Sequence, residues 1–105
     1  MSLDNELHEA ASNGDVTRIK NLISRGANVD APGLNGMSPL FQAVGSGYLN
    51  AVEALVAEGA DVHYRPANGK TALDMAIAFR EASIARFLDS KGCARTMQAP
   101  WDFRL

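Results

Sequence analysis

The sequence repeats itself every 33 residues. Shifting the chain by this length aligns it with itself without a gap, and the matched positions are leucines, alanines and glycines. The aligned sets are Leu7, Leu40 and Leu73; Ala10, Ala43 and Ala76; Leu22, Leu55 and Leu88; and Gly26, Gly59 and Gly92. A chain of 105 residues with this period is expected to form one short stack of similar units with a shared core.

Each unit contains the signals for a turn, a helix, a tight turn and a second helix. In the middle unit, Asn35-Gly36 is a turn dipeptide, Ser38 can act as an N-cap and Pro39 suits the first helical position. The sequence therefore predicts a helix that begins at Pro39 and is interrupted by the glycines at 45 and 47. A second amphipathic helix is predicted from the spacing of Leu49, Val52, Leu55 and Val56.

The third unit has the same plan with two departures. Thr71 can cap its first helix, and Asp74 stands where the carboxylate of a capping box belongs. Arg80 occupies the turn position that is Gly14 and Gly47 in the earlier units. A left-handed arginine there would cost about 1–2 kcal/mol, so this turn is predicted either to be strained or to change shape.

The chain resembles the ankyrin-repeat family, whose repeat has this length and a T-P-L-H-x-A signature at its first helix. The matching segments are Ser38-Pro39-Leu40-Phe41-Gln42-Ala43, Thr71-Ala72-Leu73-Asp74-Met75-Ala76 and Leu7-His8-Glu9-Ala10, with closing phrases Gly26-Ala27-Asn28-Val29 and Gly59-Ala60-Asp61-Val62. The resemblance implies an all-α solenoid of helix-turn-helix units with β-turn fingers. It implies one domain over residues 1–105, with repeats near 4–33, 34–66 and 67–95.

The resemblance also assigns structural roles to three single residues. His8 stands at the signature histidine, which in this family ties down backbone near the turn. Cys93 aligns with Ala27 and Ala60, so it is expected to fill a small buried space rather than to react. His63 falls in the finger between repeats, where partner contact and plain exposure are both open.

Composition argues against several other kinds of protein. The net charge is -2 and no patch of basic residues would neutralise phosphates, so we expect no nucleic-acid partner. No apolar run is long enough to span a bilayer, and the acidic start of the chain is unlike a signal peptide. Cys93 is the single cysteine, which excludes an internal disulfide and favours a reducing, cytoplasmic compartment.

Catalytic and cofactor-binding interpretations find little support. Residues 40–44 followed by Gly45-Ser46-Gly47 could be read as a strand and a phosphate loop, but Asn50 stands where a dinucleotide fingerprint needs its third glycine. The two histidines lie far apart with no further metal ligand at a suitable spacing. Glu6 and Glu9 are assigned to a solvated helix face rather than to acid–base chemistry. We therefore expect no enzyme activity, cofactor or metal.

Partner contact is expected on the concave surface, which the fingers and first helices form in proteins that resemble this one. The partner-binding residues predicted from this mapping are Leu34, Asn35, Met37, Arg65, Asn68, Lys70 and Phe79, and the wider set adds Ser12, Asn13, Gly45, Ser46, Ala67 and Ala78. Leu34, Met37 and Phe79 make the set unusually apolar, and Arg65 and Lys70 favour a partner with acidic groups.

The expected function is therefore recognition of an unidentified partner protein by a monomer. This includes a free-standing inhibitor or immunity-type protein, and a fragment of a larger regulatory protein would look the same. The alternative is a self-associating structural protein that dimerises through its C-terminal end. A nucleotide-binding enzyme is the third interpretation.

The last segment, residues 96–105, contains the single tryptophan, Trp101, together with Phe103. Ile84 and Phe87 on the last helix have no fourth repeat to cover them, and an end repeat needs a polar face or a cap. We therefore expect the segment to turn at Pro100 and fold back as a cap, with a linear motif or dimer contact as the alternative.

Overall fold

The computed structural model of the protein describes residues 2–95, which form three helix-turn-helix pairs. The pairs are α1 (Leu3–Ser12) and α2 (Val16–Ser24), α3 (Pro39–Ser46) and α4 (Leu49–Ala57), and α5 (Ala72–Ala78) and α6 (Ala82–Ser90). A short 3-10 turn, η1 (Leu34–Gly36), lies between the first two pairs. Over this part of the chain the fold is all-helical, as the repeat predicts, and residues 40–44 lie in α3 rather than in a strand.

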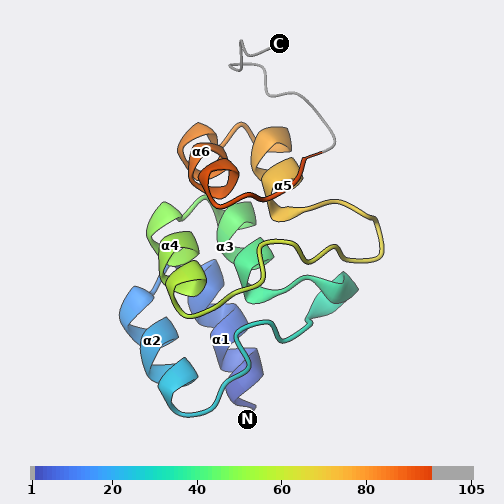
Figure 1. Cartoon of the computed structure of the whole chain (residues 1–105). Helices are drawn as coiled ribbons and strands as arrows, with labels where there is room; N and C mark the ends of the chain where they lie inside the picture. Colours follow the sequence, from blue (N-terminus) through green and yellow to red (C-terminus); the bar gives the residue numbers. More distant parts are fainter. Residues whose placement is uncertain (1, 96–105) are drawn as a thin grey trace, which may run out of the picture.

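The three pairs stack in chain order as two layers of helices (Figure 1). The first helices pack in the order α1, α3, α5, and the second helices pack behind them in the order α2, α4, α6. Residues 31–38 and 64–71 are the later parts of the connections between successive pairs, and they project from the side of the first helices. We call these segments finger 1 and finger 2.

The core follows the repeat. Leu22, Leu55 and Leu88 are fully buried between the two layers, which confirms their expected equivalence. The equivalent leucines of the first helices, Leu7, Leu40 and Leu73, are buried as well. Small residues such as Ala10, Ala43 and Ala76 are also buried between the layers, where their size lets neighbouring helices approach closely.

The first helices of repeats two and three begin where the sequence predicts, but their caps differ. Thr71 and Asp74 form a capping box: Asp74 N–H donates to Thr71 Oγ1 at 3.1 Å, and Thr71 N–H donates to Asp74 Oδ2 at 3.0 Å. Ser38 occupies the N-cap position before Pro39 but makes no side-chain cap bond. Its hydroxyl is buried without a hydrogen-bond partner.

The tight turns inside the three repeats share a left-handed residue. Gly14 has φ 69°, Gly47 has φ 79° and Arg80 has φ 57°, so the third turn keeps its shape and accepts the strain of an arginine. Each turn glycine also lies directly under a side chain of the next repeat: Tyr48 covers Gly14, and Glu81 covers Gly47. A Cβ on Gly14 would lie 2.6 Å from Tyr48 Cγ, and one on Gly47 would lie 2.8 Å from Glu81 Oε2.

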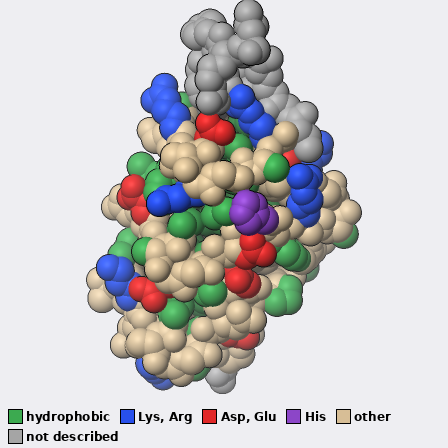
Figure 2. Space-filling model, viewed as in Figure 1, with side chains coloured by type: hydrophobic (Ala, Val, Ile, Leu, Met, Phe, Trp, Pro, Cys, Tyr) green, Lys and Arg blue, Asp and Glu red, His purple; other side chains and the backbone are tan. Residues whose placement is uncertain are grey.

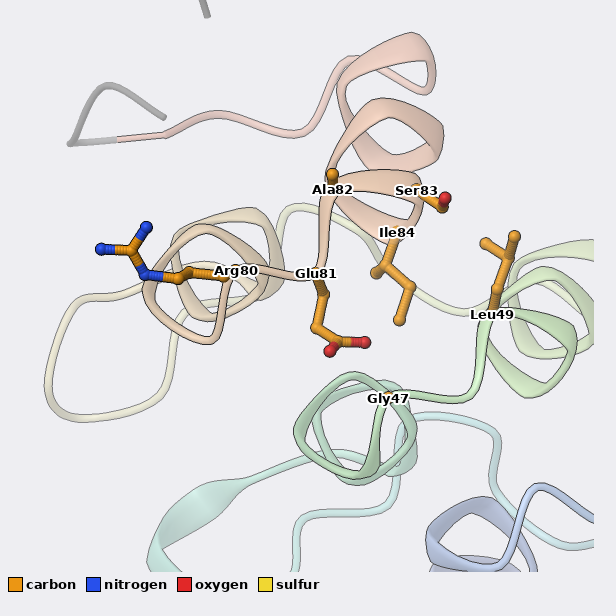
Figure 3. A pocket seen from close by; sticks show the side chains of 7 residues that line it. All are labelled: Gly47, Leu49, Arg80, Glu81, Ala82, Ser83 and Ile84. Atoms are coloured by element: carbon orange, nitrogen blue, oxygen red, sulfur yellow. The ribbon is translucent and has the colours of Figure 1, made fainter. Parts of the chain in front are cut away.

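Ile84 corrects one expectation about the end of the stack. The expectation that it lies uncovered on repeat three is wrong, because its side chain is only 2% exposed. It points toward Leu49 of repeat two, beside a shallow depression of about 360 Å³ (Figure 3). The Glu81 carboxylate points toward Gly47 in the same region, whereas the Arg80 side chain extends away from it.

Phe87 is half-buried on the last helix, and the Lys91 ammonium lies 5.4 Å from the centre of its ring. The cap predicted for Trp101 and Phe103 falls on residues 96–105, outside the described part of the chain.

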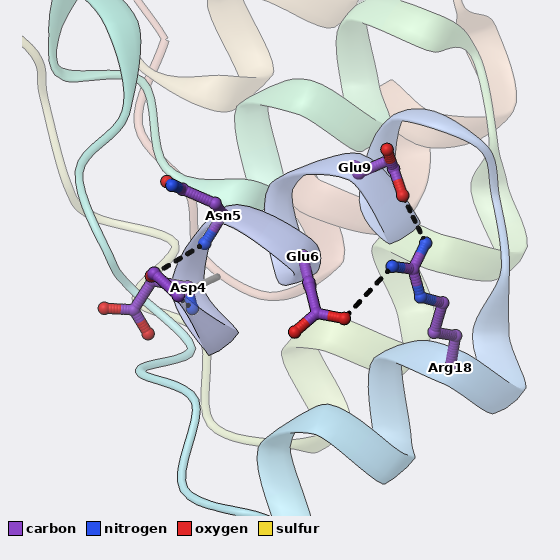
Figure 4. A network of polar contacts seen from close by, with 6 residues as sticks. Asp4, Asn5, Glu6, Glu9 and Arg18 are labelled. Carbon is purple, nitrogen blue, oxygen red and sulfur yellow. Dashed lines mark hydrogen bonds and ion pairs between the residues drawn. The ribbon is translucent and has the colours of Figure 1, made fainter.

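An ion-pair cluster joins the two helices of repeat one (Figure 4). Arg18 of α2 donates to Glu9 at 2.6 Å and approaches Glu6 at 3.5 Å, both on α1. The hydrogen bond to Glu9 is the largest cause of a raised pKa for the Arg18 guanidinium. Arg18 aligns with Ala51 and Ile84, which are buried in the later repeats. This position is apolar and buried in repeats two and three, which each have a repeat before them, whereas in repeat one it is a charged residue in an ion pair.

Candidate partner-binding surface

Finger 1 is a tight turn with a fixed tip. Asn35 and Gly36 have φ of 60° and 75°, and such successive left-handed residues favour Asn and Gly. Gly33 N–H donates to Met37 O at 2.8 Å, and Gly36 N–H donates to Gly33 O at 3.0 Å. This arrangement leaves the Leu34 side chain 83% exposed at the tip.

His8 holds the base of finger 1. Its Nε2 lies 2.8 Å from Ala31 O, and we assign the proton to Nε2 because a carbonyl can only accept. The ring lies against Gly33, where an added Cβ would be 2.7 Å from His8 Cε1. The structural role predicted for His8 is confirmed. Its other ring nitrogen, Nδ1, is buried without a partner.

Finger 2 places its polar side chains by local hydrogen bonds. Gly69 N–H donates to Pro66 O at 2.8 Å and closes the turn. Arg65 Nη1 donates to Gly69 O at 2.9 Å across the turn, and Lys70 N–H donates to Asn68 Oδ1 at 2.9 Å. Arg65, Asn68 and Lys70 are all exposed, and the turn fixes the backbone from which they project.

Tyr64 joins the two fingers, a contact that was not predicted from the sequence. Its hydroxyl donates to Gly36 O at 2.6 Å, and its ring meets Phe41 edge to face with centroids 6.1 Å apart. Phe41 stands at the position that is His8 in repeat one and Asp74 in repeat three. His8 holds finger 1 from this position, so a phenylalanine at the same position of repeat two could have predicted an aromatic contact with finger 2. The fingers are therefore fixed relative to each other as well as internally.

The structure separates the predicted contact residues into two groups. Leu34 and Asn35 lie at the tip of finger 1, and Arg65, Asn68 and Lys70 lie on the neighbouring finger 2. Phe79 ends α5, seven residues beyond its start at Ala72. A helical rise of 1.5 Å per residue puts it about 10 Å along the helix from finger 2. We call the fingers and the accessible side of α3 and α5 the finger surface.

Met37 differs from its predicted exposure. Its side chain is half-buried and packs against the core, because it follows η1 where the chain turns back toward α3. Phe79 is 54% exposed. Leu34 and Phe79 are therefore the apolar residues that this surface presents most fully to solvent.

Phe79 lies against a glycine of the neighbouring first helix. A Cβ on Gly45 would meet Phe79 Cε2 and Met75 Sδ, both at 3.7 Å, which is ordinary van der Waals contact. Gly45 lies inside α3, is exposed, and does not have the positive φ of the turn glycines. In the middle of a helix glycine costs about 0.5–1 kcal/mol relative to alanine, and in the last turn the cost is at most that. The contacts of the fold give no reason for this cost.

Cys93 and His63 are the two other residues to which the sequence drew attention. Cys93 is buried as predicted, and its thiol donates to Val62 O at 3.0 Å. Burial is the largest cause of the raised pKa of the Cys93 thiol, so it remains a weak nucleophile. His63 is exposed, and its N–H donates to Asp61 Oδ1 at 2.8 Å. Within residues 2–95 no His, Cys, Asp and Glu cluster suits a metal ion.

Charge is distributed unevenly along the stack. On the face shown in Figure 2, Lys and Arg side chains gather toward the end formed by α5 and α6, and Asp and Glu lie mainly below them. On the finger surface, the exposed charged side chains within residues 34–46 and 65–79 are Arg65 and Lys70, since Asp74 is buried. This part of the surface is apolar and positive.

Two comparisons with known proteins bear on this architecture. A family model for ankyrin repeats, in three copies, matches residues 7–98. No curated protein matches the chain closely enough to count as a relative. Ankyrin repeats are generally protein–protein interaction modules, and the family is typically non-catalytic. No helix within the described residues has the length and hydropathy needed to cross a membrane.

Proposed function

Because the chain belongs to the ankyrin-repeat family, we propose that it binds a partner protein through the finger surface and carries out no catalysis. One observation supports the choice of surface. The large apolar side chains exposed among residues 2–95 are Leu34, Phe79 and Tyr48. Tyr48 already packs on Gly14, whereas Leu34 and Phe79 both lie on the finger surface.

The rigidity of the fingers also supports binding there. Leu34 stands on a turn closed by backbone hydrogen bonds, braced below by His8 and at its side by Tyr64. A turn held in this way loses little backbone conformational freedom when a partner covers it, so more of the burial energy appears as affinity. Covering a partner enzyme, as an inhibitor or immunity-type protein does, falls within this proposal.

The test is co-purification of tagged full-length protein from the native organism, with the captured proteins identified by mass spectrometry. Leu34→Asp and Phe79→Asp should each remove the specific partner, because an anchor is lost and a carboxylate is buried in its place. Helical content measured by circular dichroism should stay at the wild-type level, since both side chains are exposed.

Asn50→Asp is the matched control, because Asn50 is exposed on α4, away from the fingers, and the change adds the same charge. It should recover the partner as wild type does. Recovery of the same proteins by all three variants would contradict the proposed surface. Light scattering should give a monomer of 11.2 kDa, and a dimer would instead favour the self-associating alternative.

A further inference from the structure

Gly45 differs from the other glycines of the fold, because neither a positive φ nor a close neighbour accounts for it. It is an exposed glycine in the last turn of α3 whose backbone has no positive φ and whose missing Cβ would make only ordinary contacts. Elsewhere in the fold the reason for glycine is visible, as at Gly14, where the Tyr48 ring stands in the place of a Cβ. A glycine that the fold itself does not require is suited to the close approach of another backbone.

The surroundings of Gly45 fit one type of occupant. Phe79 and Met75 lie directly beside it, and the neighbouring residues Ser46 and Ala78 are small and exposed. This combination offers apolar contact beside backbone that carries only small side chains. An extended segment could lie over Gly45 and place one apolar side chain against Phe79.

Charge restricts the occupant further. Arg65 and Lys70 supply the exposed charges of the finger surface in repeats two and three, and Arg80 adds a third cation directly after Phe79. The Arg65 guanidinium is held over its turn by Gly69 O at 2.9 Å, so its position is partly fixed before a partner arrives. A segment that carries carboxylates complements this surface, and one that carries Lys or Arg is repelled.

We propose that the finger surface binds an extended, acidic segment of the partner protein, with its backbone over Gly45 and an apolar side chain against Phe79. This inference rests on the proposed function. Finger 2 and Phe79 are separated by about 10 Å along α5. An extended chain covers about 3.3 Å per residue. The acidic and apolar positions of the segment are therefore three or more residues apart.

The experiment is selection from a degenerate displayed peptide library on the full-length protein. The selected sequences should combine Asp or Glu with an aromatic or aliphatic residue at least three positions away. A synthetic copy of the most enriched peptide is then titrated by fluorescence anisotropy at low and at high salt. Its affinity should fall as salt rises, because opposite charges in contact with solvent are screened.

Arg65→Glu and Lys70→Glu should each weaken that peptide about tenfold, since attraction is replaced by repulsion. Lys20→Glu, an exposed reversal on α2, is the matched control and should leave the affinity unchanged. Gly45→Ala should raise the melting temperature, by up to roughly 4 °C, because alanine favours the helix. The same change should weaken the peptide about tenfold, which a merely structural glycine would not do.

Selection of basic peptides, selection of none, or full affinity in both charge reversals would overturn the acidic segment. Wild-type affinity in Gly45→Ala would overturn the placement over Gly45. If selected peptides of another charge are lost in Leu34→Asp and Phe79→Asp, this inference fails while the proposed function stands. If those variants also bind normally, both fail. Tight binding of an oligothymidylate in the same assay would also overturn the inference, because it points to a nucleic acid instead.

Discussion

Repeats two and three have the same order of elements, but they are stabilised differently. Repeat two packs against helices on both sides, with α3 between α1 and α5 and α4 between α2 and α6. It contains a buried hydroxyl, that of Ser38, without a hydrogen-bond partner. An unsatisfied buried polar group costs about 1–3 kcal/mol, so apolar burial on two sides must offset it.

Repeat three packs on repeat two alone within the described residues, and its first helix has a full set of polar contacts instead. Thr71 Oγ1 accepts from Asp74 N–H and donates to Ala94 O at 2.5 Å. Its tight turn, on the other hand, holds the strained Arg80 rather than a glycine. The comparison indicates that the inner repeat is stabilised by interfaces on two sides, whereas the last repeat has one such interface and adds a capping box and the bond to Ala94 O.

The largest expected effect concerns the interfaces. Leu55→Ala should reduce the free energy of unfolding by about 2–5 kcal/mol, because its buried side chain lies in the repeat with helices on both sides. Leu88→Ala should lie at the lower end of that range, since a terminal helix can move inward and reduce the cavity. Urea denaturation followed by circular dichroism measures both. A loss below about 1 kcal/mol for Leu55→Ala would contradict the repeat register.

The second effect concerns the left-handed turns. Gly47→Ala should cost about 1–2 kcal/mol, because an L-residue is strained at φ 79° and its Cβ forces Glu81 aside. Arg80→Ala is the paired variant and should change stability little, since it replaces one L-residue by another at φ 57°. Gly14→Ala should cost more than Gly47→Ala, as the Tyr48 ring has less freedom to move than a carboxylate. Equal melting temperatures for the three alanine variants would contradict this account.

The smallest effect concerns the caps. Thr71→Ala should cost about 1 kcal/mol, through loss of the capping box and of the bond to Ala94 O. Thr71→Ser keeps the hydroxyl and should retain most of that stability. Ser38→Ala should be neutral or slightly stabilising, because it removes a buried hydroxyl that has no partner. Thermal unfolding of the three variants would decide the matter, and a large loss in Ser38→Ala would mean that the hydroxyl has a partner after all.

Most of the fold could be predicted because each helix boundary has a local signal. Pro39, Thr71 and the turn glycines act through backbone geometry and neighbouring bonds, and the structure confirms the start of α3 and the capping box. Of the two alternatives left open at Arg80, the structure has the left-handed one. Contacts between repeats were predicted less well, because they depend on which way a side chain points. Ile84 was assigned to an open face although it points toward repeat two. The alignment of Ile84 with Ala51 and Arg18 contained the missing signal, since only the first repeat is charged at this position.

The candidate surface was predictable in its location and less so in its details. The mapping placed Leu34, Arg65, Lys70 and Phe79 at positions where the structure shows exposed side chains. It did not find that Met37 is half-buried, because this depends on how tightly η1 turns. Tyr64 was also missed, since its bond to Gly36 O joins residues in different fingers. Whether the surface binds a partner stays a prediction.

Arg80 has a consequence for how such an array can be lengthened. A second copy of residues 34–66 inserted directly after the first would set its tyrosine on Gly47, as Tyr48 already stands on Gly14. The same copy attached after repeat three would place its tyrosine ring over Arg80, which has a Cβ. In the contact between Tyr48 and Gly14, a Cβ on the glycine would lie only 2.6 Å from Tyr48 Cγ, so the ring and the Arg80 Cβ would clash. Duplication within the stack is therefore sterically permitted, and addition at its last turn first requires that Arg80 be replaced by glycine.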